Sequence, residues 1–195
     1  MKNKIENKKL RAVIFFGSPK KDGYTAKLLN LVIKKLEGLY SFQFIDSYKL
    51  NIKPCIDCGE CKKKDECIYS DFSLIDYELK TADLSIIATP IYNLSVPAPL
   101  KSIFDRMQIY FNKRFVKNII PPIEKEKKAI LIATCGSNDL RGFEIVKTQV
   151  KMIFTIINAK LEKSLCWTNT DSAKDEKEIK FKVNKVFDNV EFFKK

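Results

Sequence analysis

The chain has 195 residues, 36 Lys and Arg against 24 Asp and Glu, and 45% hydrophobic residues. That size and composition predict one domain, residues 1–195, whose core needs no disulfide or metal to hold it together. The net charge of +12 comes from lysines interleaved with acidic residues, and no nucleic-acid-binding motif accompanies them, so we expect no nucleic-acid partner. The chain has no histidine, which excludes Ser–His and Cys–His catalysis and histidine-ligated metals.

The apolar runs of the sequence are short. Only five apolar residues, 12–16, follow the basic N-terminal stretch, whereas a secretory signal needs roughly 7–15. No run approaches the roughly 18 residues that a transmembrane helix requires. We therefore expect a cytoplasmic protein without membrane contact.

Apolar segments with the lengths of strands alternate with longer amphipathic segments. The predicted strands are Ala12–Phe16, Phe42–Ile45, Leu84–Ala88, Ala129–Ala133 and Leu161–Trp167. The predicted helices are Thr25–Leu39, one that begins at Asp71 as its N-cap, one from Pro97 to about Phe111, Gly142–Asn158 and Lys174–Val190. This alternation predicts an α/β fold, a doubly wound parallel sheet with helices on both faces. Such sheets bind ligands beyond the carboxyl ends of their strands, so the loops after the first, third and fourth strands form the candidate site.

The loop after the first strand, residues 17–25, has the composition of an anion-binding turn. Ser18 and Thr25 offer hydroxyl groups, Lys20 offers a positive charge, and the following helix presents backbone N–H groups. The loop lacks the glycine spacing of a Rossmann turn and the Lys-Ser/Thr pair of a P-loop. The alternative interpretation is a plain Gly/Pro turn with Thr25 as the helix cap.

The loops after the third and fourth strands have features that suit a planar ring. Tyr92 can supply a wall for an isoalloxazine. Backbone N–H groups around Ile91, Asn93 and Gly136 can bind the polar edge of such a ring.

In these three loops the sequence resembles the NADPH-dependent FMN reductase family, in its iron–sulfur flavoprotein branch. The resemblance spans roughly residues 10–167. It is carried by Gly17-Ser18-Pro19-Lys20 through Thr25–Leu29, by Thr89-Pro90-Ile91-Tyr92 through Phe104-Asp105-Arg106, and by Thr134-Cys135-Gly136-Ser137. It implies a flavodoxin-like five-stranded sheet of order 2-1-3-4-5 that binds FMN.

The resemblance also assigns the candidate FMN-binding residues. Those implied for the phosphate are Ser18, Lys20, Tyr24 and Thr25. Those implied for the ring and the ribityl chain are Pro90, Ile91, Tyr92 and Asn93, with Thr134, Cys135 and Gly136 at the far edge of the ring. Asp105 and Arg106 also match the family, and we interpret them as a structural ion pair rather than as catalytic residues. We expect Trp167 and Cys166 in the core.

Four cysteines lie in one polar loop at about residues 52–70, namely Cys55, Cys58, Cys61 and Cys67. The spacing C-x2-C-x2-C-x5-C keeps three thiols close together and is typical of ferredoxin-type clusters. A structural zinc site more often uses two CxxC pairs separated by a longer spacer. The same spacing occurs in iron–sulfur flavoproteins, so the resemblance implies a [4Fe–4S] site, with zinc or an empty loop as the alternatives.

These features predict an oxidoreductase that passes electrons between FMN and a [4Fe–4S] cluster, in which the cofactors rather than side chains carry the chemistry. NAD(P)H is the candidate donor, and a redox protein such as ferredoxin or a small molecule is the candidate acceptor. The family implies a homodimer or homotetramer. The alternatives are an NAD(P)H-dependent FMN, quinone or nitro reductase without a cluster, and a non-catalytic flavodoxin-like carrier.

Overall fold

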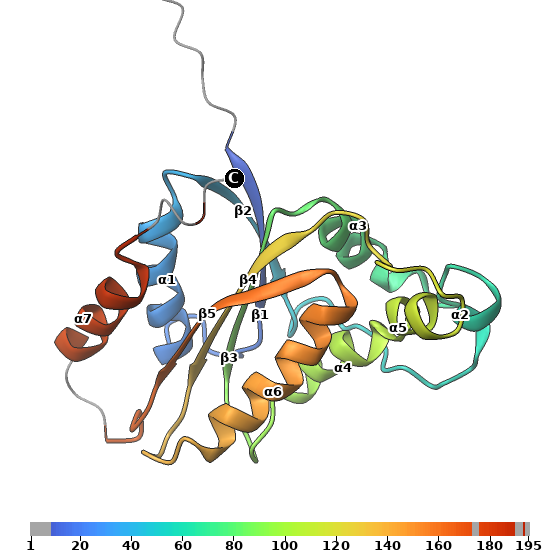
Figure 1. The fold of residues 1–195 in the computed structure, drawn as a ribbon. Coiled ribbons are helices and arrows are strands. Elements are labelled where there is room, and N and C mark those ends of the chain that lie inside the picture. The colour runs from blue at the N-terminus through green and yellow to red at the C-terminus, as the bar shows by residue number, and fades with distance from the viewer. Residues whose placement is uncertain (1–8, 173–175, 190–192, 194–195) are drawn as a thin grey trace, which may run out of the picture.

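A computed structural model describes residues 9–172, 176–189 and 193 of the chain. At its centre is a parallel sheet of five strands in the order β2-β1-β3-β4-β5 (Figure 1). The strands are β1 (Leu10–Phe16), β2 (Tyr40–Asp46), β3 (Leu84–Pro90), β4 (Lys127–Thr134) and β5 (Ala159–Trp167). The predicted fold class, the sheet order and the five strands are thus confirmed, and each strand extends slightly beyond the apolar run that predicted it.

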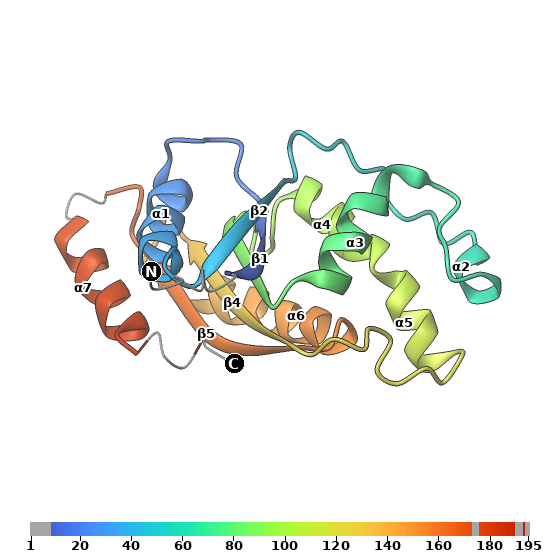
Figure 2. The ribbon, with the colours of Figure 1, turned by 90° about the horizontal axis from the view of Figure 1, so that it is seen from above.

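Helices cover both faces of the sheet (Figures 1 and 2). One face carries α1 (Tyr24–Leu36) and α7 (Glu176–Phe187). The other face carries α3 (Ser73–Thr81), α4 (Ala98–Arg106), α5 (Gln108–Phe115) and α6 (Arg141–Ile156). The predicted ends of the last helix, Lys174 and Val190, lie outside the described residues.

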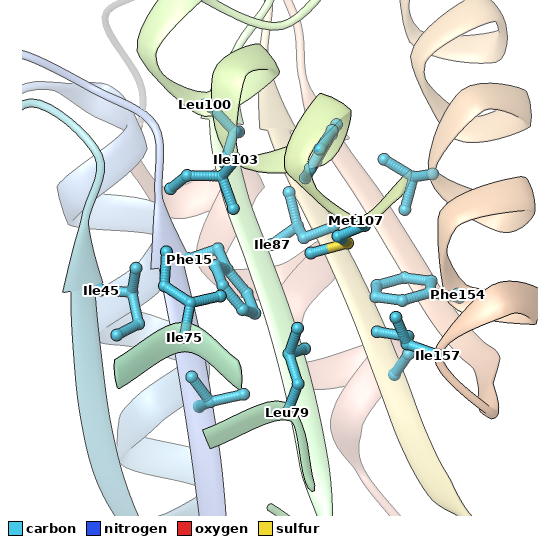
Figure 3. Packing of buried hydrophobic residues seen from close by; sticks show 14 of the residues in the cluster. Phe15, Ile45, Ile75, Leu79, Ile87, Leu100, Ile103, Met107, Phe154 and Ile157 are labelled. Atoms are coloured by element: carbon cyan, nitrogen blue, oxygen red, sulfur yellow. The ribbon is translucent and has the colours of Figure 1, made fainter. Parts of the chain in front are cut away.

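The two faces of the central strands supply two separate cores. On β1, Val13 and Phe15 pack beneath α3 and α4, whereas Ile14 and Phe16 face α1 and α7. Figure 3 shows the first of these cores, in which Phe15 lies near residues of α3 and α4. All of β3 is buried, which explains why it appears in the sequence as a continuous apolar run. Trp167 belongs to the second core, as predicted.

The helix predicted from Pro97 to about Phe111 is in fact two helices. Met107 separates α4 from α5, with ψ at 1° and its amide bonded to the carbonyl of Phe104. Its side chain is buried in the first core (Figure 3). Because the chain changes direction at this anchored residue, α5 runs outward beside the cysteine loop (Figure 1).

Two expectations about residues 47–72 were also wrong. The polar loop contains a short helix, α2 (Glu60–Lys63), and ends in a 3₁₀ helix, η1 (Ser70–Phe72). Asp71 lies inside η1 and caps neither η1 nor α3. Its carboxylate is instead used in tertiary contacts, described below. Among the described residues, the structure has no helix that is both long and apolar enough to span a membrane.

Lys127, at the start of β4, is a buried cation. Its side chain is held by the carbonyls of Lys125 and Ile157, at 2.9 and 3.0 Å from Nζ. Burial lowers the pKa of Lys127 to about 8, and the neighbouring Lys125 charge lowers it further. The protonated form is therefore disfavoured in the folded state.

We expect Lys127 to make stability rise with pH above about 8. Between that value and the usual lysine pKa the unfolded chain binds more protons than the folded one, so deprotonation favours folding. Relative to Lys127→Met, the wild type should gain about 2 kcal/mol of unfolding free energy between about pH 7 and pH 9.5, measured by urea denaturation. The exposed Lys160→Met variant is the control and should follow the wild type. If the difference in unfolding free energy between wild type and Lys127→Met stayed constant over this pH range, the lowered pKa of Lys127 would be contradicted.

Candidate functional site

The loop after β1 turns in close contact with β3. The amide of Gly17 donates to the carbonyl of Ala88 at 2.8 Å, which extends the sheet hydrogen bonding into the loop. A Cβ at this position would lie 2.7 Å from Leu100 Cδ2 and 3.0 Å from Thr89 Oγ1. Glycine is therefore required here by the close approach of α4 and β3.

The rest of this loop forms a compact turn in front of α1. Ser18 is buried, and its hydroxyl group is bonded to the amide of Lys20 at 3.2 Å and to the Lys20 carbonyl at 3.3 Å. Gly23 precedes α1 without a side-chain cap, and the first turn of α1 contains no acidic residue. Lys20 is exposed and forms no ion pair within the described residues. The start of α1 can therefore accept an anion.

Thr25 links this loop to the end of β4. Its hydroxyl oxygen lies 2.8 Å from that of Thr134, and both side chains are buried. Thr25 is inside α1 rather than at its cap, so the alternative interpretation of Thr25 as a helix cap is wrong. Tyr24 packs edge-on against Trp167, with the ring centroids 4.9 Å apart, so its ring lies against β5.

The loop after β3 presents Tyr92 at a tight turn. The amides and carbonyls of Tyr92 and Ser95 bond each other at 2.9 Å, and Asn93 and Leu94 between them have φ of 50° and 61°. Two consecutive left-handed residues closed in this way form a type I′-like turn. The Tyr92 side chain is 46% exposed, so it is available to a ligand. The amide of Ile91, however, donates to the Thr134 carbonyl at 2.9 Å, so this N–H group is not the free donor that we predicted.

The loop after β4 is closed by the segment that follows β5. The Cys135 amide donates to the Trp167 carbonyl at 2.9 Å, and the Asp171 amide donates to the Gly136 carbonyl at 3.2 Å. A Cβ at Gly136 would overlap the Asp171 carboxylate, so any larger residue would displace that exposed side chain. The partly buried Cys166 packs against the first core, and burial raises its pKa to about 12, which keeps it a thiol.

Sequence reasoning missed two residues at this edge of the sheet, Tyr48 and Asp171. Tyr48 and Tyr92 are both half-exposed, and burial, followed by the charge interaction with Tyr92, raises the pKa of Tyr48. Tyr48 comes two residues after β2, at the carboxyl edge where ligands bind, and that position was the signal available in the sequence. No comparable local pattern marks Asp171, because its approach to Gly136 depends on how the chain folds back after β5.

The four cysteines of the β2–α3 loop line a single cavity, together with Arg106, Gln108 and Ile109 at the junction of α4 and α5. Cys55 and Cys58 are exposed, and Cys61 and Cys67 are partly buried. Within the described residues, no three Cys, Asp or Glu side chains converge closely enough to form a ready metal site. A bound metal or cluster would have to draw the sulfurs together, as metals commonly organise their own ligands.

Arg106 fixes both ends of the cysteine loop. Its guanidinium group is buried and donates to the carbonyl of Lys53 at 2.9 Å and to that of Tyr69 at 3.1 Å. It also forms an ion pair with Asp71 at 2.8 Å, and Asp71 accepts the amide of Lys53. Burial raises the pKa of Asp71, but the bonds from Arg106 and the Lys53 amide outweigh this and leave the pKa lowered.

We predicted a structural ion pair for Asp105 and Arg106. Each residue does form an ion pair, but with a different partner. Arg106 pairs with Asp71 across the fold. Asp105 is exposed and pairs with Lys101 one turn away on α4, at 2.5 Å. The two neighbouring residues do not pair with each other.

The sheet order 2-1-3-4-5, with helices on both faces and three loops meeting at the carboxyl edge, defines a flavodoxin-like α/β protein. Residues 10–168 match the family model described as NADPH-dependent FMN reductase, and the chain belongs to this family of oxidoreductases.

Proteins similar to this chain carry two kinds of name. An iron–sulfur flavoprotein of Archaeoglobus fulgidus is 32% identical over 110 residues, 55% of this chain and 50% of that protein. FMN-dependent NADH:quinone oxidoreductase 2 of Colwellia psychrerythraea is 40% identical over 86 residues, 41% of this chain and 37% of that protein. The chain thus spans about half the length, or less, of these relatives.

The fold is also found among solved structures. An NAD(P)H:quinone oxidoreductase from Methanothermobacter marburgensis superposes with a TM-score of 0.72 at 18% identity, over 94% of this chain and 96% of that chain. At this low identity the similarity establishes the shared fold.

We expect Arg106→Met to release the cysteine loop. The substitution leaves Asp71 and two carbonyls without their buried partner and should cost about 3–5 kcal/mol of unfolding free energy. Hydrogen exchange should report faster exchange of the Lys53 amide. Asp105→Ala is the matched control, because it removes only an exposed pair on the same helix and should cost less than about 1 kcal/mol. If the two substitutions lowered the unfolding free energy equally, Arg106 would not be what holds the ends of the cysteine loop.

Proposed function

We propose that this protein is an electron-transfer flavoprotein that binds FMN at the carboxyl edge of its sheet and a [4Fe–4S] cluster at its four loop cysteines. The observation that carries the proposal is that Cys55, Cys58, Cys61 and Cys67 line one cavity beside buried N–H donors, in a chain of the FMN reductase family. The similarity to a protein named iron–sulfur flavoprotein supports it.

The FMN phosphate is assigned to the turn between β1 and α1. The residues proposed to hold it are Ser18, Lys20, Tyr24 and Thr25. The uncapped start of α1, whose first turn has no acidic residue, supports this assignment because backbone N–H groups and the Lys20 charge both favour an anion. Since the ring of Tyr24 packs on Trp167, we assign the contribution of Tyr24 to its backbone.

The isoalloxazine is assigned to the space between the loops after β3 and β4. The residues proposed to contact it are Pro90, Ile91, Tyr92, Asn93, Thr134, Cys135 and Gly136. The exposed ring of Tyr92, held on a rigid turn, supports a flat apolar wall.

The cysteine loop suits a negatively charged iron–sulfur group. Thiolate ligands leave such a cluster with negative charge. Arg106 lines the same cavity, and the Asn112 amide contacts the sulfur of Cys61. Asp57 and Gly59 both have a positive φ. These two residues lie between the first three cysteines and allow the chain to fold back there.

When bound, FMN exchanges electrons in pairs or singly and the cluster exchanges them singly, so the protein supplies binding and orientation rather than an acid or a base. We propose NAD(P)H as the electron donor and a redox protein such as ferredoxin, or a small molecule, as the acceptor. We further propose a single domain over residues 1–195, a homodimer or homotetramer, and a cytoplasmic location.

A second candidate function is an NAD(P)H-dependent FMN, quinone or nitro reductase in which the cysteines hold no cluster. The exposure of Cys55 and Cys58 and the separation of the sulfurs favour this reading. The similarity to a protein named FMN-dependent NADH:quinone oxidoreductase also favours it. The two candidates share the FMN site and differ only in the cysteine loop.

The phosphate assignment predicts that Lys20→Glu weakens FMN binding at least roughly tenfold, because it places a negative charge beside the phosphate. Lys34→Glu, at the far end of α1, makes the same change in charge and is the matched control. Fluorescence titration of the apoprotein with FMN measures both dissociation constants. The same affinity in the two variants would place the phosphate elsewhere.

The cluster assignment predicts about four irons and four sulfides per chain after anaerobic reconstitution, as a four-thiolate cubane requires. Cys61→Ala should lose the iron and keep FMN, because the two sites share no ligand. Cys166→Ala, which changes a buried thiol in β5, should keep both. Metal and sulfide analysis distinguishes the alternatives: stoichiometric zinc without sulfide would establish a structural zinc loop, and no metal with full NAD(P)H-driven acceptor reduction would establish the plain reductase.

A further inference from the structure

Asn112 on α5 is a buried polar residue whose side chain contacts the cysteine loop. The residue is 1% exposed, and its Nδ2 lies 3.0 Å from the sulfur of Cys61. Its Oδ1 has no hydrogen-bond partner in the part of the chain that the structure describes. A buried amide with one end unsatisfied costs stability, so the contact of its other end with sulfur calls for a functional explanation.

The chemistry of the two groups fixes which end of the amide can face a ligand. A cysteine thiolate accepts hydrogen bonds and cannot donate one, so only the NH₂ end of Asn112 interacts favourably with a deprotonated Cys61. Hydrogen bonds to the sulfurs are among the factors that set the reduction potential of an iron–sulfur cluster. The near-complete burial of Asn112 strengthens such a bond, because water does not compete for either partner.

The α4–α5 junction contributes a second N–H group on the same side. Arg106 lines the cysteine cavity, and its buried Nε has no hydrogen-bond partner among the residues described. Gln108, one turn before Asn112 on α5, also lines the cavity but makes no hydrogen bond to a cysteine sulfur in the described chain. Asn112 is thus distinguished from the neighbouring amide by its contact with sulfur.

We propose that Asn112 is a positioning residue for the iron–sulfur cluster: it orients Cys61 and raises the reduction potential of the cluster through an Nδ2–H···Sγ hydrogen bond. The proposal rests on the cluster assignment of the proposed function. A bound cluster would supply one-electron chemistry, and Asn112 would act on it through Cys61 with no bond made or broken at that residue. The added negative charge is shared by the sulfurs, so an N–H dipole stabilises the reduced form more than the oxidised form.

The test is a redox titration of the reconstituted protein with dithionite, in which electron paramagnetic resonance follows the reduced cluster. Asn112→Leu removes the donor and keeps the number and branching of side-chain heavy atoms, and it should shift the midpoint potential to a more negative value. Asn112→Asp replaces the donor with an anionic acceptor and should shift it further in the same direction. Gln149→Leu, which makes the same kind of change on α6 away from this cavity, is the control and should leave the potential at the wild-type value. An unchanged potential in Asn112→Leu, with iron and sulfide retained, would overturn the inference.

A measurement on the wild type does not depend on whether these variants fold. Protein made with asparagine labelled with ¹⁵N in its side chain should show coupling of that nitrogen to the reduced cluster in pulsed electron paramagnetic resonance. The absence of such coupling would overturn the inference while leaving the cluster assignment intact. If the wild type binds zinc or no metal, the proposed function fails, and the role of Asn112 fails with it.

Discussion

Parallel pairing of β1, β3 and β4 with both faces covered is the constraint on which the rest of the molecule depends. All of β3 is buried, so its backbone groups must be paired within the sheet. Pairing continues past the strand ends, from the Gly17 amide to the Ala88 carbonyl and from the Ile91 amide to the Thr134 carbonyl. The loops at the carboxyl edge are therefore positioned by the sheet, and their exposed side chains are left free for a ligand.

The helix α4 connects this edge to the cysteine loop. It begins directly after the Tyr92 turn and ends at Arg106, which holds both ends of the cysteine loop. Leu100 and Ile103 anchor its inner face in the core (Figure 3). Because a packed helix moves as a unit, a substitution that displaces α4 should disturb the loop after β3 and the cysteine loop together.

The cysteine loop is anchored to the first core. It leaves the sheet at the end of β2 and lies beside α5 (Figures 1 and 2), and Ile52 belongs to the first core while Cys61 and Cys67 pack against it. Lys117 and Lys113 of the α5 region reach Asp65 on it, at 2.7 and 3.5 Å, so ion pairs add to these apolar contacts.

The sequence by itself determined the strands, the sheet order implied by the family resemblance, and the loops that carry the candidate FMN residues. Those features follow from local apolar runs and from turn residues such as Gly17, which act over a few positions of the chain. Only the tertiary structure decided that Asp71 pairs with Arg106 rather than capping a helix, that the helix after Pro97 breaks at Met107, and that Asn112 reaches Cys61. In each case the contact was decided by which groups the folded chain brings next to a polar or flexible side chain. Such partners lie 35 to 51 positions away in the sequence for Asp71 and Asn112, beyond the reach of any local pattern.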